Sequence, residues 1–477
     1  MNRKTVHSVG IDIGTTTTQV IFSRLTMVNR APVTQVPRYE FVEREIFFQS
    51  PVRPTPLQED GAVDVPMLQR FIDEQFAAAG LTLSDIETGA IIITGETSKA
   101  KNAKDTVMGL AERLGDFVVA TAGPNLESVI AGRGSGAGEY SKRNHALVLN
   151  IDIGGGTSNY VVFNSGDVED TACLNIGGNL IKTDRTGFVT RIREPAKQVI
   201  ESMFGEVLPE ARLSVDHLKK IANCMAELVV DVIVGKGSEL GGKLMMTPGL
   251  KGAGEFDAIF ISGGVGTSYY RLRTEEIDSF QWEDMGVLLA GALLKHPILA
   301  AMNVKKPLQT QQATVIGAGA YSMSLSGSSI WLNVDTLPIR NIPVVQPQID
   351  WQANDQPPVC QQVIEAAKRM DLRLREDKYA IALGKDMPMT YRIVSHTAKE
   401  IAKYYQQYGN NQSAAIIVTE NDLGKVLGME LQPLIEPQRL LVIDEVRAVA
   451  GDYLDIGESF FGGEVVPLTI KSLAFPA

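Results

Sequence analysis

Two stretches of the chain share one pattern, in which an apolar run, an aspartate, a glycine turn and a second apolar run follow one another. The first is Val6 to Phe22, VHSVGIDIGTTTTQVIF, and the second is Leu147 to Phe163, LVLNIDIGGGTSNYVVF. Short apolar runs bounded by turn residues predict buried strands, so each stretch predicts a hairpin. Both contain the string IDIG and they lie about one domain length apart, which favours a duplicated fold over two unrelated hairpins.

Apolar strands alternate with amphipathic helices on either side of the second hairpin. The pattern predicts strands over 90–94, 117–122 and 172–176, and helices over 65–79, 125–131, 217–234 and 285–295. This alternation is typical of α/β domains with a central, mostly parallel sheet.

The composition shifts after residue 330 towards Pro, Gln, Asp and Asn, which we interpret as a linker. The sequence therefore predicts four parts, which are a first α/β domain over 1–146, a second over 147–330, a linker over 331–358 and a smaller C-terminal α/β unit over 359–477.

Composition narrows the class of protein. The chain has 477 residues, a net charge of −11 and no basic cluster, which argues against nucleic-acid and anionic-membrane partners. Its three cysteines lie far apart, which suggests a reducing compartment. The N-terminus enters a predicted strand with no apolar signal segment, and no apolar run is long enough to span a membrane. We expect a cytoplasmic protein.

Each predicted hairpin places an aspartate directly before its turn. Three consecutive glycines, Gly154 to Gly156, leave the second turn without side chains, so backbone N–H groups can approach an anion. A carboxylate repels a phosphate unless a cation such as Mg²⁺ lies between them. Asp12 and Asp152 therefore predict a phosphate and Mg²⁺ site clamped between the two halves. For either copy alone, a plain hairpin with a glycine turn is the alternative.

A second glycine pair, Gly263-Gly264, follows the apolar run 258–262. A flat base or ribose can pack against such a backbone at the start of a helix, and an ordinary strand–turn–helix is the alternative. Segments 125–134 and 314–321 are rich in small residues and predict helices that pack closely at a hinge. Glu127 either faces the cleft and orients an attacking water, or is a solvated surface residue.

One glycine-rich segment imitates a different phosphate site. Residues Gly237 to Lys243, GSELGGK, fit the spacing of a P-loop up to its lysine, but the next residue is Leu244 and not Ser or Thr. We interpret this segment as a flexible loop.

Taken in order, five segments resemble the motifs of the ATPase superfamily that contains actin, the heat-shock chaperones and the sugar kinases. VGIDIGTTTTQV and NIDIGGGTSNY are similar to the two phosphate motifs, FISGGVG to the adenosine motif, and NLESVIAG and VIGAGAYS to the two connecting helices. The resemblance implies an α/β fold of duplicated actin-like (ribonuclease H-like) ATPase domains around a nucleotide cleft, plus a smaller C-terminal α/β unit.

Within that superfamily the chain resembles, from end to end, the ethanolamine ammonia-lyase reactivating factors. Strings outside the ATPase motifs, such as AIIITGE, TACLN and GDYLDIG, carry this resemblance. It implies an ATP- and Mg²⁺-dependent chaperone that releases damaged cobalamin from ethanolamine ammonia-lyase so that intact adenosylcobalamin can bind again. ATP hydrolysis is expected as part of reactivation, without small-molecule product chemistry.

The superfamily motifs also imply roles for individual residues. Asp12 and Asp152 would hold Mg²⁺ through water, and together with Glu127 they form the predicted catalytic set. The residues implied to bind the nucleotide are Gly14, Thr15, Thr16, Gly154, Gly155, Gly156 and Thr157 at the phosphates, and Gly263 and Gly264 at the adenosine.

The resemblance implies ethanolamine ammonia-lyase and ATP or ADP as partners. The C-terminal unit has no counterpart among the superfamily motifs, so we hypothesise that it contacts the lyase. Two alternatives are a small-molecule kinase of the same fold and an actin-like filament protein. The sequence leaves open whether the protein works in the open cytosol or at a bacterial microcompartment.

Overall fold

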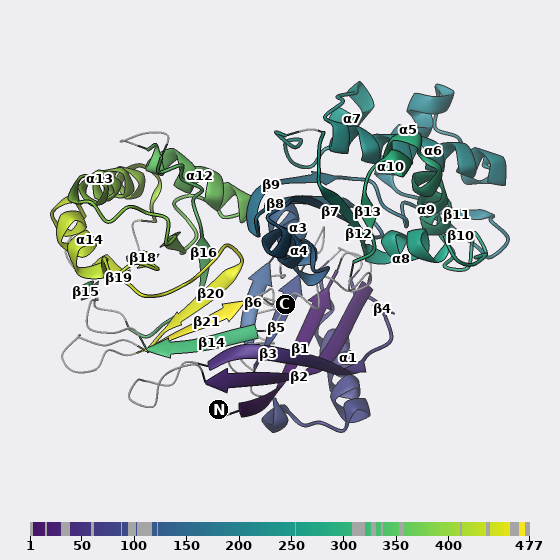
Figure 1. The fold of residues 1–477 in the computed structure, drawn as a ribbon. Coiled ribbons are helices and arrows are strands. Elements are labelled where there is room, and N and C mark those ends of the chain that lie inside the picture. Colours follow the sequence, from purple (N-terminus) through teal and green to yellow (C-terminus); the bar gives the residue numbers. More distant parts are fainter. Residues whose placement is uncertain are drawn as a thin grey trace.

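The structure, a computed structural model, describes residues 3–14, 17–29, 39–58, 62–86, 88–93, 102, 117–121, 123–252, 254–307, 320–325, 331–334, 337–352, 357–410, 413–435, 439–457 and 467–472. Three α/β units, each built on its own large sheet, form the molecule (Figure 1). The predicted α/β class is confirmed.

The first sheet has the strand order β3-β2-β1-β5-β6. Its strands are β1 (Arg3–Ile13), β2 (Thr17–Asn29), β3 (Tyr39–Gln49), β5 (Thr88–Ile93) and β6 (Phe117–Thr121). β1, β2 and β3 are antiparallel neighbours, whereas β5 and β6 continue from β1 in parallel. Helix α1 (Val65–Ala79) buries Leu68, Ile72 and Phe76 in the core of this unit.

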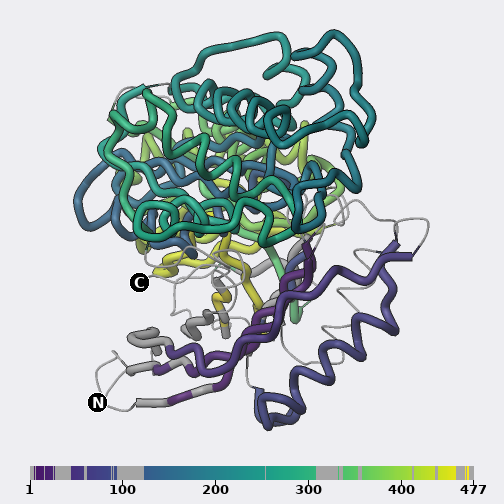
Figure 2. The backbone as a smooth tube through the Cα atoms, turned by 90° about the vertical axis from the view of Figure 1, so that its right-hand side faces the viewer, coloured from purple at the N-terminus to yellow at the C-terminus, as the bar shows by residue number. Residues whose placement is uncertain are grey.

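The second sheet repeats this arrangement strand for strand, in the order β9-β8-β7-β12-β13. Its strands are β7 (Leu147–Ile153), β8 (Ser158–Asn164), β9 (Asp167–Leu174), β12 (Ala258–Ser262) and β13 (Val304–Lys305). β7, β8 and β9 are antiparallel, and β12 and β13 run parallel to β7. The same order and the same directions confirm the predicted duplication. Figure 2 shows the first unit below the second, with the strands of its hairpin rising towards it.

Helix α6 (Val215–Val234) shows how local sequence sets the ends of an element. The Oγ of Ser214 accepts a hydrogen bond from the N–H of His217 at 3.3 Å, and Gly235 ends the helix in a left-handed conformation with φ 65°. Leu218 and Met225 belong to its buried face in the core of the second unit. Burial of each such side chain stabilises the fold by about 1.5–3 kcal/mol.

Helix α3 (Pro124–Gly134) lies against β8 and β9, in front of the second sheet in the view of Figure 1. A Cβ at Gly132 would collide with Cγ1 of Val161 and lie 2.8 Å from Cε2 of Phe163. Only glycine allows this close approach of helix and sheet. The predicted helix over 125–134 is confirmed, but its close approach at Gly132 is to strand β8 and not to another helix.

The third sheet has the order β14-β21-β20-β16-β17-β18-β19-β15. Its strands are β14 (Ala320–Leu325), β15 (Trp331–Val334), β16 (Ile339–Val345), β17 (Ala380–Leu383), β18 (Ala415–Thr419), β19 (Arg439–Ile443), β20 (Asp452–Ile456) and β21 (Pro467–Ser472). β16 to β19 are parallel, and helices α12 (Val359–Arg369), α13 (Tyr391–Tyr408) and α14 (Gly424–Leu431) connect them. At its far edge, β14 lies beside β3 of the first unit (Figure 1).

The other regular elements are β4 (Arg53–Pro54), β10 (Ile181–Thr183), β11 (Val189–Ile192), α4 (Ala137–Asn144), α5 (Glu194–Phe204), α7 (Glu239–Leu244), α8 (Gly263–Arg271), α9 (Gly286–Lys295) and α10 (Pro297–Ala301).

Three predictions differ from the structure. Part of the expected linker over 331–358 forms β15 and β16, because the short apolar run around Val344 is buried in the third unit. Residues 320 and 321, expected at the end of a helix over 314–321, begin β14, while 314–319 lie outside the described residues. The expected loop over 237–243 contains the short helix α7, which Ser238 caps through the N–H of Gly241 at 3.0 Å. The domain boundaries stay predictions.

A buried carboxylate caps α14 inside the third unit. Asp444 Oδ2 accepts the N–H of Gly424 at 2.9 Å, whereas Oδ1 has no hydrogen-bond partner and the side chain is fully buried. Burial, with Asp422 and Glu445 nearby, raises the pKa of Asp444 to about 6.

We expect Asp444→Asn to raise the thermal unfolding midpoint above that of the wild type at about pH 8, by a few degrees. Because the pKa is higher in the folded state, the ionised carboxylate weakens the fold, and this loss develops as the pH rises through about 6. The difference between the two proteins should therefore shrink as the pH falls towards about 4. Midpoints across this range measure it, and a gain that does not depend on pH would contradict the expectation.

Candidate functional site

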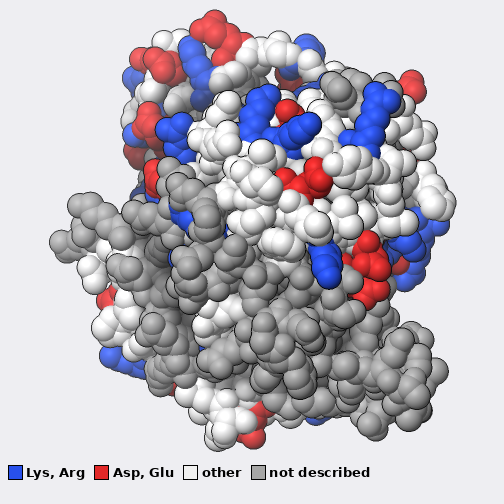
Figure 3. Space-filling model, turned by 90° about the vertical axis from the view of Figure 1, so that its left-hand side faces the viewer, with Lys and Arg blue, Asp and Glu red and all other residues white. Residues whose placement is uncertain are grey.

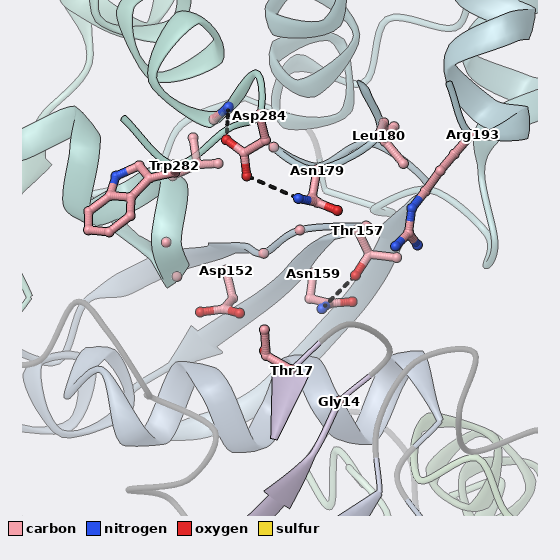
Figure 4. A pocket seen from close by; sticks show the side chains of 18 of the residues that line it. Gly14, Thr17, Asp152, Thr157, Asn159, Asn179, Leu180, Arg193, Trp282 and Asp284 are labelled. Carbon is pink, nitrogen blue, oxygen red and sulfur yellow. Dashed lines mark hydrogen bonds between the residues drawn. The ribbon is translucent and has the colours of Figure 1, made fainter. Parts of the chain in front are cut away.

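A cavity of about 990 Å³ opens between the first and second units. The ends of both duplicated hairpins line it, with Asp12 and Gly14 on one side and Asp152 and the turn 154–157 on the other. Figure 4 shows Gly14 and Thr17 below, Asp152 and Asn159 in the middle, and Asn179 and Asp284 above.

Equivalent hydrogen bonds close the two hairpin turns. The N–H of Gly14 donates to the carbonyl of Thr17 at 2.9 Å, and the N–H of Gly154 donates to the carbonyl of Thr157 at 3.0 Å. Across each hairpin the aspartate pairs with an amide residue, Asp12 with Gln19 and Asp152 with Asn159. The duplication therefore extends to the details of the turn. Thr15 and Thr16 lie outside the described residues.

Asp152 ends a chain of buried hydrogen bonds. Ser135 Oγ donates to Asn150 Oδ1 at 2.7 Å, Asn150 Nδ2 donates to Ser262 Oγ at 3.2 Å, and Ser262 Oγ donates to Asp152 Oδ1 at 2.5 Å. The Asp152 side chain is only 8% exposed, and burial raises its pKa although the Ser262 hydroxyl opposes the shift. A carboxylate held in this way gains from a cation placed beside it.

The glycines of the site fall into two groups. A Cβ at Gly154, Gly156 or Gly264 would meet no atom within 4 Å, so these residues face open space in the cavity. Gly263 has φ +83° and a Cβ there would lie 2.7 Å from the carbonyl carbon of Ile153, so this glycine serves packing. Gly177 likewise packs on the turn, where the next N–H groups, of Gly178 and Asn179, donate to the carbonyls of Gly154 and Gly155 at 2.9 and 2.7 Å.

Unsatisfied polar atoms are concentrated along this cavity. Within the described part of the chain, four buried side-chain atoms without a hydrogen-bond partner belong to residues that line it, namely Asn159 Oδ1, Asn179 Oδ1, Arg193 Nε and Gln198 Oε1. Native structures rarely leave such groups unpaired, so their arrangement here is typical of a site that receives a polar ligand.

The same wall carries residues that sequence analysis did not single out. Asp284 Oδ2 accepts from Asn179 Nδ2 at 3.2 Å and its Oδ1 from the N–H of Gly286 at 2.8 Å, and burial raises the pKa of Asp284. Trp282, 56% exposed, and Lys182 also line the cavity. Lone residues on the turns after β9 and before α9 carry no motif, so no signal in the sequence marks them.

The described members of the predicted set all line this one cavity. They are Asp12, Gly14, Glu127, Asp152, Gly154, Gly155, Gly156, Thr157, Gly263 and Gly264. Glu127 reaches the cavity from α3. Of its two expected positions, the cleft or the solvated surface, the structure has the cleft. The role of each residue stays a prediction.

Two negative findings apply to the described residues. No group of three or more His, Cys, Asp or Glu side chains could hold a metal ion there. Across the same part of the chain, every helix is too short or too polar to cross a membrane.

Gly177 and Gly156 allow the packing role of glycine to be separated from its role in the cavity. A Cβ at Gly177 would lie 2.6 Å from the carbonyl carbon of Gly155, whereas one at Gly156 meets nothing. We expect Gly177→Ala to lower the free energy of unfolding by about 1–3 kcal/mol. The matched control Gly156→Ala should change it by less than about 1 kcal/mol. Denaturant unfolding of both variants checks this, and equal losses would contradict the assignment.

Known proteins resemble the chain over its whole length. The family model for the "ethanolamine utilisation protein EutA" matches residues 4–476. A protein of Salmonella typhimurium is 48% identical over 477 residues and one of Escherichia coli 47% over 484 residues, each with 100% of both chains covered. Both are named ethanolamine ammonia-lyase reactivase EutA.

Solved structures are more distant. The Ppx/GppA phosphatase of Aquifex aeolicus is 15% identical with a TM-score of 0.39, covering 65% of this chain and 98% of its own. The ethanolamine utilization protein EutJ of Carboxydothermus hydrogenoformans is 16% identical with a TM-score of 0.31, covering 65% and 88%. The full-length sequence matches carry the conclusion, and this chain belongs to the EutA family of ethanolamine utilisation proteins.

Proposed function

We propose that this chain is an ATP-dependent reactivating factor that releases damaged cobalamin from ethanolamine ammonia-lyase in the cytoplasm. The observation that carries the ATPase part is the meeting in one cavity of two Asp–Gly turns that are closed by equivalent hydrogen bonds. The lyase as partner rests on the name of the two full-length relatives.

The residues of the cavity fit a nucleotide with Mg²⁺. Asp12 and Asp152 would hold the ion through water, so its direct ligands would be water and phosphate oxygens, as Mg²⁺ prefers. When bound, the ion would neutralise charge on the phosphates. The open backbone at Gly154 and Gly156 offers N–H groups to the phosphates, and Gly264 leaves room for the adenosine.

The side chains of this chain would carry the remaining steps. Glu127 would orient the attacking water and accept its proton, since it reaches the cavity from α3. We assign residues 1–146 and 147–330 to two halves whose relative position follows the nucleotide state. That movement would act on the lyase and open its cobalamin site.

We propose that the third unit contacts the lyase. The side of the molecule viewed in Figure 3 has Lys, Arg, Asp and Glu interspersed among uncharged side chains on its described part, with no broad field of one sign.

Deleting residues 358–477 would not test this contact cleanly, because Leu126 and Ile130 of α3 belong to the same core as this unit. Point substitutions are therefore preferable to truncation.

Asp152→Asn is expected to lower ATP hydrolysis by about 100-fold or more, because it removes the charge that would hold Mg²⁺ without changing side-chain volume. Its thermal midpoint should match or exceed that of the wild type, since a buried charge is lost. Phosphate release with Mg²⁺ and ATP measures the rate. Asp216→Asn, at an 86% exposed position on α6, is the control and should hydrolyse ATP normally. Normal turnover by Asp152→Asn would contradict the site.

A rescue assay tests the function itself. Ethanolamine ammonia-lyase blocked with hydroxocobalamin is mixed with this protein, Mg²⁺, ATP and fresh adenosylcobalamin, and ethanolamine deamination is followed. We expect activity to return only with ATP and not with the Asp152→Asn variant. If ATP is hydrolysed while the lyase stays inactive, the reactivating function is wrong and the small-molecule kinase becomes the leading candidate.

A further inference from the structure

Helix α3 packs against both the second and the third unit, and it also lines the cavity. Its Leu126 and Ile130 pack in the hydrophobic core of the third unit, and its Val129 packs in a core of the second unit. Glu127, between them in sequence, lines the cavity. Any shift of this helix would therefore change both the position of Glu127 in the cavity and the packing of the third unit.

The N-terminal turn of α3 takes its cap from another unit. Its own N-cap residue is Gly123, which has no side chain, so the first N–H groups of the helix need acceptors from elsewhere. Asp371, after the end of α12, provides them. Its Oδ2 accepts the N–H of Leu126 at 2.8 Å and its Oδ1 accepts from Asn125 Nδ2 at 3.0 Å. A carboxylate at this end of a helix also interacts favourably with the helix dipole.

The fit between cap and helix is close. A Cβ at Gly123 would lie 2.7 Å from both Cβ and Oδ2 of Asp371, so only glycine leaves room for the carboxylate. Asp371 itself has φ 56°, a left-handed conformation that is uncommon for residues other than glycine and that Asp tolerates better than most. Both partners of this contact are thus specialised for it.

Further contacts fix the same end of α12 to the second unit. Thr171 Oγ1 on β9 donates to Asn125 Oδ1 at 3.0 Å, which orients the amide that donates to Asp371. The guanidinium of Arg369 donates to the carbonyl of Glu169 at 3.4 Å, and Lys251 forms an ion pair with Glu365 at 3.4 Å. The last turns of α12, the first turn of α3 and β9 therefore form one junction.

We propose that Asp371 is a positioning residue, which holds the first turn of α3 so that Glu127 keeps its place in the cavity, and which thereby links the third unit to the ATPase site. The inference rests on the proposed function for its kinetic part. Leu126, whose N–H the carboxylate accepts, directly precedes Glu127. Small displacements of a catalytic group can cost about 100-fold in rate without altering how tightly substrate binds.

The test compares full-length variants that each lose the cap of one helix, either α3 or α14. Asp371→Ala removes the cap of α3, whereas Asp444→Ala removes the cap of α14 within the third unit and touches neither α3 nor the cavity. Asp371→Asn keeps an oxygen that can accept the N–H of Leu126. Gly123→Ala displaces the carboxylate without deleting it.

Two measurements are made on each variant. The first gives kcat and KM for ATP hydrolysis, and the second is amide hydrogen exchange. We expect Asp371→Ala and Gly123→Ala to lower kcat about tenfold or more with KM unchanged within about twofold. Exchange should become faster in residues 125–130 of both variants. Asp371→Asn should recover most of kcat, and Asp444→Ala should keep the kcat of the wild type while exchange becomes faster in α14 instead.

The inference is overturned if Asp371→Ala leaves kcat at the value of Asp444→Ala, or if exchange in residues 125–130 stays at the wild-type rate. A wild-type chain that hydrolyses no ATP would refute the proposed function instead. In that case exchange in α3 alone decides whether Asp371 holds the helix.

Discussion

The candidate site depends on a buried carboxylate at the point where the duplicated halves meet. Asp152 lies at the end of β7 and accepts a hydrogen bond from Ser262, the last residue of the neighbouring strand β12. Through Asn150 and Ser135 the same chain of hydrogen bonds reaches the turn after α3. A buried charge costs free energy unless it is paired, and the Mg²⁺ of the proposed function would offset this cost at Asp152.

The glycines around this carboxylate are of two kinds, those that allow backbone packing and those that face the cavity. Gly177 and Gly263 allow backbone to pack on backbone behind the turn, while Gly154, Gly156 and Gly264 leave the front open. The turn is thus rigid on one side and accessible on the other. This combination suits a ligand whose charged groups are met by N–H groups and water.

Sequence reasoning succeeded where the determining contacts are local. A hydrogen bond between the first and last of four neighbouring residues closes each hairpin turn. Because this contact is local, the apolar runs and glycine turns around the two IDIG strings were enough to predict both hairpins. The helix over 217–234 followed from apolar periodicity, and the structure has it over Val215–Val234. The linker over 331–358 was wrong for β15 and β16. In β16 the average composition concealed a short apolar stretch with Ile342, Val344 and Val345 buried, which forms a strand only within the third sheet.

The sequence by itself determined that two Asp–Gly hairpins recur, that strands alternate with helices and that the chain is acidic, because these depend on neighbours along the chain. Tertiary structure alone decided that Asn179, Arg193, Gln198 and Asp284 line the same cavity as Asp152. It also decided that Asp371 caps a helix 245 residues before it. Contacts of this kind arise from the packing of whole units against one another, and no periodicity or spacing in a single sequence encodes which distant side chains that packing brings together.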